Sequence, residues 1–194
     1  PKPFYHKNGV IVFHGDCLEL LPLFPDKFSD LLFTDPPYGV SYFGGHHKLK
    51  QDAPEMRTIQ NDETADIYGK FLPLILRIVD GPCYLWFAGS QARRVYDAVE
   101  DNGFVIGNML IWNKNVIAGA INSCYIPKHE PFLYFKTPGS TFRWCGPTNE
   151  CTVWDCKKEA VNDLHPTQKP VYLAHRAIKN HDVKMVLDPF AGSG

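Results

Sequence analysis

The feature that most constrains this chain is an apolar stretch that ends abruptly in an acid and two prolines. Residues 31–34 are Leu-Leu-Phe-Thr, and residues 35–39 are Asp-Pro-Pro-Tyr-Gly. An apolar run of this length, closed by a proline pair, is typical of a buried strand that leaves its sheet at that point. Each proline fixes φ and removes a backbone donor, so the turn is stiff and its carbonyl groups stay unpaired. Ligands bind at the carboxyl ends of strands in open α/β sheets, so Asp35 and Tyr38 are candidate site residues; a plain strand-ending turn is the alternative.

A comparable turn lies at the other end of the chain. Residues 185–188 (Met-Val-Leu-Asp) predict a strand, and residues 189–194 (Pro-Phe-Ala-Gly-Ser-Gly) predict a glycine-rich turn after it. Glycine there lets the backbone approach a ligand closely. Residues 165–170 (His-Pro-Thr-Gln-Lys-Pro) precede a helix predicted over 171–180. A lysine beside a helix N-terminus suits a carboxylate or a phosphate, although a plain helix cap explains this segment equally well.

Strand and helix patterns alternate between these turns. The last two strands of the series lie close together, which predicts a mostly parallel α/β sheet with an antiparallel strand near one edge. Asp16 follows the first strand, where it could accept hydrogen bonds from a ribose or an amine, or cap the next helix. The remaining predicted strands are 10–13, 83–87, 103–112 and 131–136. The other predicted helices are 66–79, 91–100 and a short one that carries the leucines of residues 18–23 and ends at Pro25.

Length and composition limit the class of protein. The 194 residues predict one domain, and 44% hydrophobic with 21% charged residues is typical of a globular protein. The net charge of −1 means that a nucleic-acid partner would have to meet a local basic surface. No apolar run is long enough to predict a membrane span, and no signal peptide is evident. The six cysteines include no Cys-x-x-Cys pair. A zinc set of Cys145, Cys151, Cys156 and His165 is a weaker alternative to reduced thiols.

Three motifs together carry a family resemblance: residues 35–38, residues 165–170 and residues 188–194. In this order they resemble the signature of DNA amino-methyltransferases of the permuted β group, with the catalytic turn first and the glycine turn last. Residues 111–114 (Ile-Trp-Asn-Lys) and 129–131 (His-Glu-Pro) also lie where that family has later motifs. The resemblance implies a Rossmann-like methyltransferase sheet, S-adenosylmethionine as methyl donor without a metal, and a flipped base in double-stranded DNA as acceptor.

The resemblance also implies roles for particular residues. Asp at position 35 is the form usual in adenine-N6 enzymes, whereas serine is commoner in cytosine-N4 enzymes. The implied catalytic residues are Asp35, Pro36, Pro37 and Tyr38. The implied cofactor-binding residues are Asp16, Thr167, Gln168, Lys169, Asp188, Phe190, Gly192 and Gly194.

The expected function is therefore site-specific adenine-N6 methylation of DNA, in the manner of a restriction-modification enzyme. Cytosine-N4 transfer and a catalytically silent DNA-binding relative stay open as alternatives. We expect one catalytic domain over 1–194, incomplete at its C-terminus because the family's ribose-binding acid would follow Gly194, with a small target-recognition insertion at 137–164. A cytoplasmic protein of bacterial or phage origin is expected, with the recognition sequence and homodimer formation left open.

Overall fold

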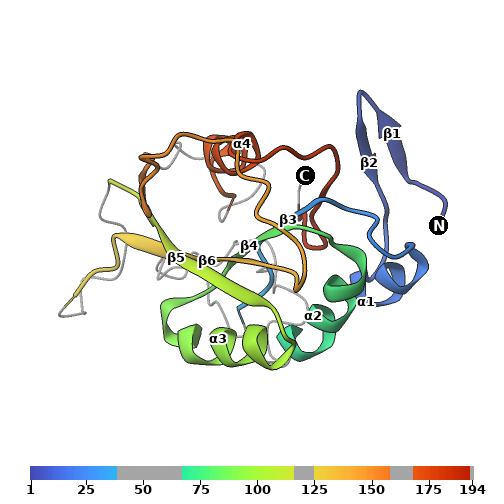
Figure 1. Cartoon of the computed structure of the whole chain (residues 1–194), viewed down its shortest axis with the longest axis horizontal. Helices are drawn as coiled ribbons and strands as arrows, with labels where there is room; N and C mark the ends of the chain where they lie inside the picture. Colours follow the sequence, from blue (N-terminus) through green and yellow to red (C-terminus); the bar gives the residue numbers. More distant parts are fainter. Residues whose placement is uncertain (39–66, 116–124, 158–167, 193–194) are drawn as a thin grey trace, which may run out of the picture.

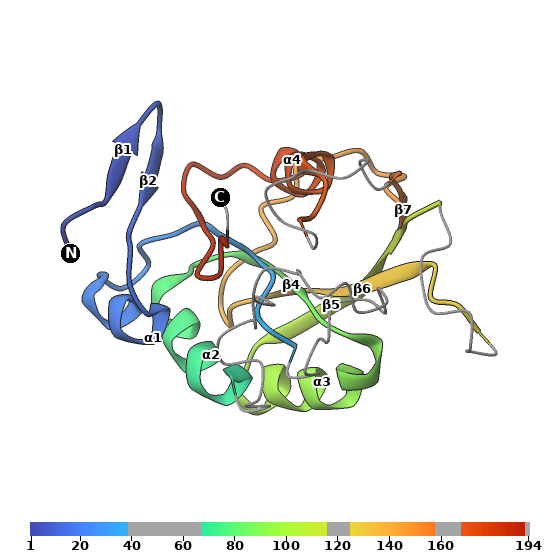
Figure 2. The same cartoon turned by 180° about the vertical axis from the view of Figure 1, so that it is seen from behind.

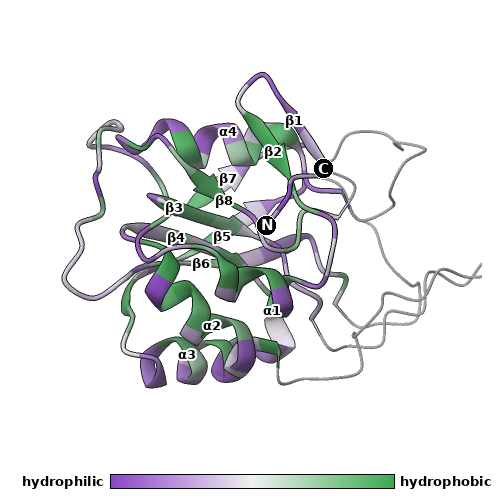
Figure 3. Cartoon of the chain, turned by 90° about the vertical axis from the view of Figure 1, so that its right-hand side faces the viewer, coloured by the Kyte–Doolittle hydropathy of each residue, from purple (hydrophilic) through white to green (hydrophobic). Residues whose placement is uncertain are grey.

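The computed structural model describes residues 1–38, 67–115, 125–157 and 168–192. A six-stranded sheet forms the middle of three layers. Helices α1, α2 and α3 cover one face of the sheet, and α4 covers the other (Figures 1 and 3). These helices are Cys17–Leu20, Ile67–Ile78, Ala92–Asp101 and Val171–Lys179.

The strands of the main sheet run in the order β7-β5-β6-β4-β3-β8. Neighbours pair in parallel, except that β6 is antiparallel to both β4 and β5. Five strands therefore point toward one edge, and β6 alone begins there. The sequence predicted this mostly parallel α/β sheet with one reversed strand, and the structure confirms it. The strands are β3 (Leu31–Thr34), β4 (Pro82–Trp86), β5 (Val105–Asn113), β6 (His129–Lys136), β7 (Val153–Asp155) and β8 (Val186–Leu187).

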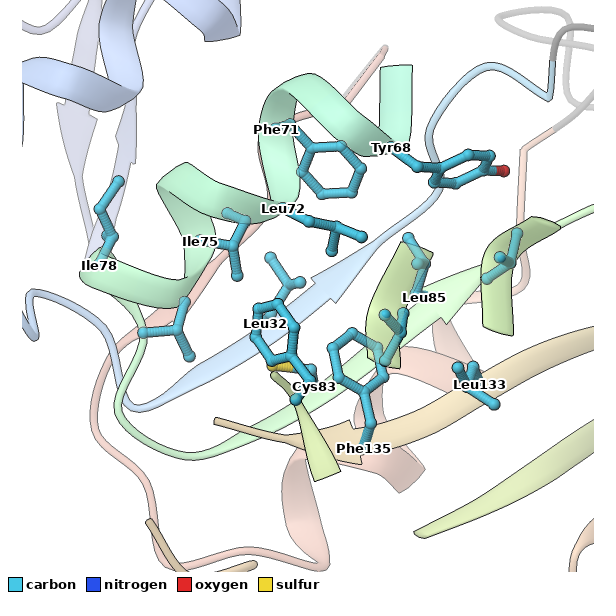
Figure 4. Packing of buried hydrophobic residues seen from close by; sticks show 14 of the residues in the cluster. Leu32, Tyr68, Phe71, Leu72, Ile75, Ile78, Cys83, Leu85, Leu133 and Phe135 are labelled. Atoms are coloured by element: carbon cyan, nitrogen blue, oxygen red, sulfur yellow. The ribbon is translucent and has the colours of Figure 1, made fainter. Parts of the chain in front are cut away.

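Side chains alternate between the two faces of the sheet because successive residues of a strand point in opposite directions. Leu32, Cys83 and Leu85 face α2 and α3, where they pack on Phe71, Leu72 and Ile75 in one core cluster (Figure 4). Leu31, Tyr84 and Trp86 face the other side and pack in a second cluster with Leu173 and Ala177 of α4. Strands β3 and β4 at the centre of the sheet are thus buried on both faces, as their continuous apolar sequences require.

The N-terminal strand differs from its sequence-based expectation. Residues 10–13 were expected to give a parallel strand, but β2 (Val10–Val12) pairs only with β1 (Tyr5–Lys7), in an antiparallel hairpin whose residues are all exposed. Figure 2 shows this hairpin standing beside the C-terminal turn, apart from the main sheet. Three β-branched residues in a row suit a strand in either setting, and only the turn at Asn8 and Gly9, both with positive φ, selects the hairpin.

The segment that follows β6 also contributes to the sheet. It contains β7, a strand the sequence did not predict, which pairs with β5. Trp154 of β7 is 1% exposed and belongs to the α4-side core. His181 Nε2 lies 2.7 Å from the hydroxyl of Tyr84, and its Nδ1 lies 2.6 Å from the carbonyl of Phe142, so a buried polar contact ties this segment to β4. Residues 137–157 are therefore packed on the domain rather than projecting from it.

Within the part of the chain that the structure describes, no helix has the length and apolar character needed to cross a membrane.

Candidate functional site

The candidate site lies at the edge where β3, β4 and β8 end. Because β3 and β8 are parallel neighbours, the acids that follow them are brought together from opposite ends of the sequence. Thr34 donates a 2.7 Å hydrogen bond to Asp188 Oδ1, which also accepts from Phe190 N at 3.0 Å. The pairing of β3 with β8 thus joins the proline turn to the glycine turn.

Asp35 is the centre of a compact polar cluster. Its Oδ1 accepts a 2.5 Å hydrogen bond from the hydroxyl of Tyr38, and its Oδ2 accepts a 2.6 Å hydrogen bond from Lys169 Nζ. Lys169 Nζ also lies 3.2 Å from the Tyr38 hydroxyl and 5.5 Å from the centre of the Tyr38 ring. The acid and the aromatic residue of the proline turn therefore meet, as the sequence predicted, and the lysine of the second motif joins them.

A second carboxylate completes the cluster. Glu130 Oε2 lies 3.2 Å from Lys169 Nζ, and Glu130 Oε1 lies 2.5 Å from Lys114 Nζ. Glu130 reaches this edge because β6 runs against its neighbours, so its first residues lie beside the last residues of β5, where Asn113 pairs with His129. Reversal of one strand places a carboxylate where five other strands end.

Burial and neighbouring charges set the ionisation of these groups. Burial disfavours the charged form of Glu130, but Lys169 and Lys114 outweigh it and hold the pKa of Glu130 below its usual value. Burial raises the pKa of the Tyr38 hydroxyl well above its usual value, and the Asp35 and Glu130 carboxylates raise it further. The cluster therefore contains a neutral phenol donor and two lysines that balance two acids.

The acid of the glycine turn is in a different environment. Burial raises the pKa of Asp188, while the hydrogen bonds from Thr34 and the backbone of Phe190 oppose this rise. Phe190 packs edge-on against Phe71 at 5.3 Å, which fixes the turn to the core. Gly192 has a φ of +63°, a conformation that a residue with a side chain adopts less readily.

The other residues singled out from the sequence are placed as follows. Asp16 accepts a 2.8 Å hydrogen bond from Leu18 N and caps α1, which is one of the two roles considered for it. Pro36 is buried and Pro37 is partly buried in the turn. Gln168 is partly buried beside Lys169. Thr167, Gly194 and His165 lie outside the described residues. Among the described residues, no group of three or more His, Cys, Asp and Glu side chains is arranged to hold a metal ion.

Sequence reasoning did not select several residues that the fold brings to this edge. Tyr68 of α2 is buried, and its hydroxyl has no hydrogen-bond partner among the described residues. Burial raises the pKa of Tyr68, and the nearby Asp35 carboxylate adds to the effect. Trp86 at the end of β4 has its ring centre 5.1 Å from Lys169 Nζ. The family-like positions of Lys114 and Glu130 were a signal for those two, whereas nothing local distinguished Thr34, Tyr68 or Trp86.

Comparison with protein families shows which family the chain belongs to. Residues 29–194 match the family described as DNA methylase. The chain belongs to the DNA methylase family. This membership confirms the family predicted from the three motifs, and with it the enzyme class of a DNA methyltransferase that uses S-adenosylmethionine.

Relatives of this DNA methylase include Type II methyltransferases of bacteria. The Type II methyltransferase M2.DpnII of Streptococcus pneumoniae is 28% identical over 225 residues, which cover 100% of this chain and 81% of the relative. The Type II methyltransferase M.HinfI of Haemophilus influenzae is 30% identical over 216 residues, which cover 94% of this chain and 59% of the relative.

Solved structures show the same fold. The M1.HpyAVI–SAM complex matches with a TM-score of 0.68 at 22% identity, covering 94% of this chain and 82% of that one. The cytosine-N4-specific PvuII DNA methyltransferase matches with a TM-score of 0.73 at 17% identity, covering 96% and 76%. The methyltransferase sheet predicted from the sequence is therefore confirmed.

Proposed function

We propose that this DNA methylase transfers a methyl group from S-adenosylmethionine to the exocyclic N6 of an adenine in double-stranded DNA. The observation that carries the proposal is the Asp35 carboxylate at the end of β3. It accepts hydrogen bonds from an ammonium group at 2.6 Å and from a phenol at 2.5 Å, so both of its oxygens face donors in a partly buried site. A carboxylate with two accepting oxygens suits an amino group that must donate hydrogen bonds.

The chemistry explains why these residue types are needed. The adenine amine is a poor nucleophile because its lone pair is delocalised into the ring. Asp35 and the carbonyl of Pro36 can accept its two hydrogens and favour a nitrogen with a localised lone pair. Pro36 and Pro37 stiffen the turn, so these acceptors are preorganised. The ring of Tyr38 can stack on the base, which must leave the duplex to reach the turn.

The methyl donor would bind at the adjoining half of the edge, near Asp188, Phe190 and Gly192. Two features fit it: a buried carboxylate beside a glycine turn, and the hydroxyl of Tyr68, which lies near Asp35 and has no hydrogen-bond partner among the described residues. When bound, S-adenosylmethionine would supply an electrophilic methyl group on a positively charged sulfur, for a displacement in which a nitrogen–carbon bond forms and the sulfur leaves as a neutral thioether. The further residues proposed to contact it are Asp16, Thr167, Gln168, Lys169 and Gly194.

Several finer assignments belong to the same proposal. Residues 137–164 are proposed to contact the DNA target beside the catalytic part of a single domain. A role in restriction-modification is supported by the Type II methyltransferases among the relatives. The cytoplasm as the site of action and a homodimer as the working form stay predictions.

Methylation of unmethylated bacterial DNA with labelled S-adenosylmethionine tests the proposal. We expect the label in N6-methyladenine after digestion to nucleosides, and we expect Asp35→Ala to lower the rate by at least about a hundredfold because it removes an acceptor that acts in the transition state. Asp97→Ala removes an exposed aspartate of α3 and is the matched control.

Three other outcomes have distinct meanings. Label in N4-methylcytosine would replace adenine by cytosine as the substrate. Undiminished transfer by Asp35→Ala would refute the role of the proline turn. Cofactor binding without transfer by the wild-type chain would favour a catalytically silent relative.

A further inference from the structure

Lys169 occupies a position that the chemistry of the site gives to the substrate. Its ammonium nitrogen lies 2.6 Å from Asp35 Oδ2, while Tyr38 donates to Asp35 Oδ1 at 2.5 Å. A primary ammonium group and the amino group of a base are both nitrogen donors that a carboxylate can accept. In this arrangement Lys169 therefore provides the donor that an amino group would bring to Asp35.

A second acceptor for the same ammonium group lies next to the first. Lys169 Nζ is 3.2 Å from Glu130 Oε2, and that oxygen is buried without an aligned hydrogen bond among the described residues. The other oxygen of Glu130 is already held by Lys114 at 2.5 Å. Glu130 thus has a fixed orientation and one oxygen that is near Lys169 without an aligned hydrogen bond, and a buried acceptor in this state gains free energy when a donor moves into line with it.

The surroundings let the ammonium group move between the two acids. Lysine carries a compact charge on a flexible four-carbon chain. Lys169 Nζ lies 5.1 Å from the centre of the Trp86 ring and 5.5 Å from that of Tyr38, so aromatic faces attract the cation along the way. Because the two acids are balanced by two lysines, a shift of Lys169 from Asp35 to Glu130 leaves the charge of the cluster unchanged.

We propose that Lys169 is the resting counter-ion of Asp35 and that Glu130 receives its ammonium group when the target amine enters. This inference rests on the proposed function, because it assumes that Asp35 must accept from the base. In this role, which is separate from the cofactor contact proposed for Lys169, both residues act through Asp35 and are positioning residues. Lys169 holds the Asp35 carboxylate in its orientation before the base arrives, and Glu130 lets Lys169 leave Asp35 without leaving a partly buried ammonium group unpaired.

The charges near Asp35 determine the effect expected from substitutions at Glu130 and Lys169. A cation nearby favours the ionised carboxylate, and a second carboxylate nearby opposes it. In Glu130→Gln, Asp35 is the only anionic partner left to Lys169 among the described residues. In Lys169→Met, Asp35 loses its cation. Within the described parts of the chain, the titratable or charged groups that face this cluster are Tyr38, Tyr68, Lys114, Glu130, Lys169 and Asp188.

The test compares the pH dependence of kcat/KM for methyl transfer in these two variants with that of the wild-type protein. We expect the acid limb of Glu130→Gln to lie at lower pH than that of the wild type, and that of Lys169→Met to lie at higher pH. We also expect Glu130→Gln to raise the KM for DNA by about tenfold, since the locked lysine competes with the base, with a smaller change in kcat. Glu100→Gln and Lys70→Met, both at exposed positions, are the matched controls.

A measurement without turnover separates this inference from the proposed function. Carbon-13 labelling of aspartate carboxyl groups, with the Asp35 signal assigned from Asp35→Asn, should show the same opposite shifts in its titration. If Glu130 and Lys169 had only structural roles, the two substitutions would change stability or kcat but would not move the acid limb in opposite directions. The inference would be overturned if the acid limbs of both variants lay at the same pH as that of the wild type, or if both limbs shifted in the same direction.

The wild-type result decides the proposed function independently. If the wild-type chain makes no N6-methyladenine, that function fails, while the carboxyl titration still decides whether Lys169 and Glu130 compete for the ion pair. If Lys169→Met does not fold, Lys169→Gln, which keeps a polar side chain without the charge, is expected to give the same direction of shift.

Discussion

At the scale of single residues, the aspartates of this chain differ in their hydrogen-bond partners and therefore in their roles. Asp35 faces an ammonium group and a phenol, Asp188 faces a hydroxyl and a backbone amide, and Asp16 caps a short helix. Asp30 has no part in the candidate site. Its Oδ2 accepts from the backbone amides of Lys184 and Met185 at 3.0 Å each, and its Oδ1 lies 3.1 Å from Arg143 Nη1. It therefore fixes the start of β8 beside β3.

The stability that Asp30 provides should depend on pH. Burial acts against the charged form, but the two amides and Arg143 outweigh it and hold the pKa of Asp30 below its usual value. A lowered pKa in the folded state means that the contribution is complete above the unfolded value of about 3.9 and is lost as the pH falls through the folded value. We expect Asp30→Asn to lower the free energy of unfolding by about 1–2 kcal/mol at pH 7.

Urea unfolding at pH 7, 5, 4 and 3 measures this effect. The difference between Asp30→Asn and the wild type should persist down to about pH 4 and shrink below it. Asp97→Asn, an exposed residue of α3, should change stability little at any of these values. A difference of the same size at pH 7 and pH 3 would contradict the assignment of the effect to the ionised carboxylate.

At the scale of elements, the geometry of the sheet depends on how closely neighbouring strands begin. Gly81 immediately precedes β4, and a Cβ atom there would lie 2.1 Å from the backbone oxygen of Asp30. Gly81 N also donates to Thr137 Oγ1 at 3.1 Å. Gly81, at the start of β4, thus lies between Asp30, just before β3, and Thr137, just after β6, with no room for a side chain.

Gly81→Ala should therefore destabilise the protein strongly. The contact is with backbone, which cannot rotate away, so we expect a loss of at least about 3 kcal/mol in the free energy of unfolding, measured by urea denaturation. Gly89→Ala is the matched control, because a Cβ at Gly89 would meet no atom within 4 Å. Equal stability of the two variants would show that this close approach is absent.

The elements also show where sequence patterns suffice and where they do not. The helix at α2 was predictable from the spacing of Ile67, Phe71 and Ile75, whose side chains are buried as expected. β7 was not predictable, because three residues carry too little pattern to distinguish a strand from a loop. The hairpin strand β2 was predicted as a strand but assigned to the wrong sheet, because the periodicity of residues 10–12 does not indicate a partner and the Asn8-Gly9 turn, which does, was not considered.

At the scale of the whole molecule, the described residues divide into a buried sheet with its helices and an exposed N-terminal hairpin. The two core clusters occupy opposite faces of the same sheet. The residues of β1 and β2 are all exposed, and Phe13, just after β2, is the first residue to pack against the core, with its ring centre 5.1 Å from that of Phe24. The hairpin should therefore contribute little to the stability of the domain.

Removal of residues 1–12 tests this division. We expect the free energy of unfolding to change by less than about 1 kcal/mol, and the slope of its dependence on urea to fall only slightly, because little buried surface is lost. Phe13→Ala in the full chain should cost more, since it removes a ring that packs against the core. A truncated chain much less stable than Phe13→Ala would show that the hairpin is part of the cooperative core.

The sequence by itself determined the family, the mostly parallel sheet and the two turns that carry Asp35 and Asp188, because prolines, glycines and apolar runs act locally on the backbone. Only the tertiary structure brought those turns together, through the pairing of β3 with β8. It also delivered Glu130 to the site through the reversed strand β6, and set Lys169 between two carboxylates. Such contacts join residues more than a hundred positions apart in some cases, as for Asp35 and Lys169, and depend on strand order and direction. No local pattern specifies these, because they follow from the packing of the whole sheet.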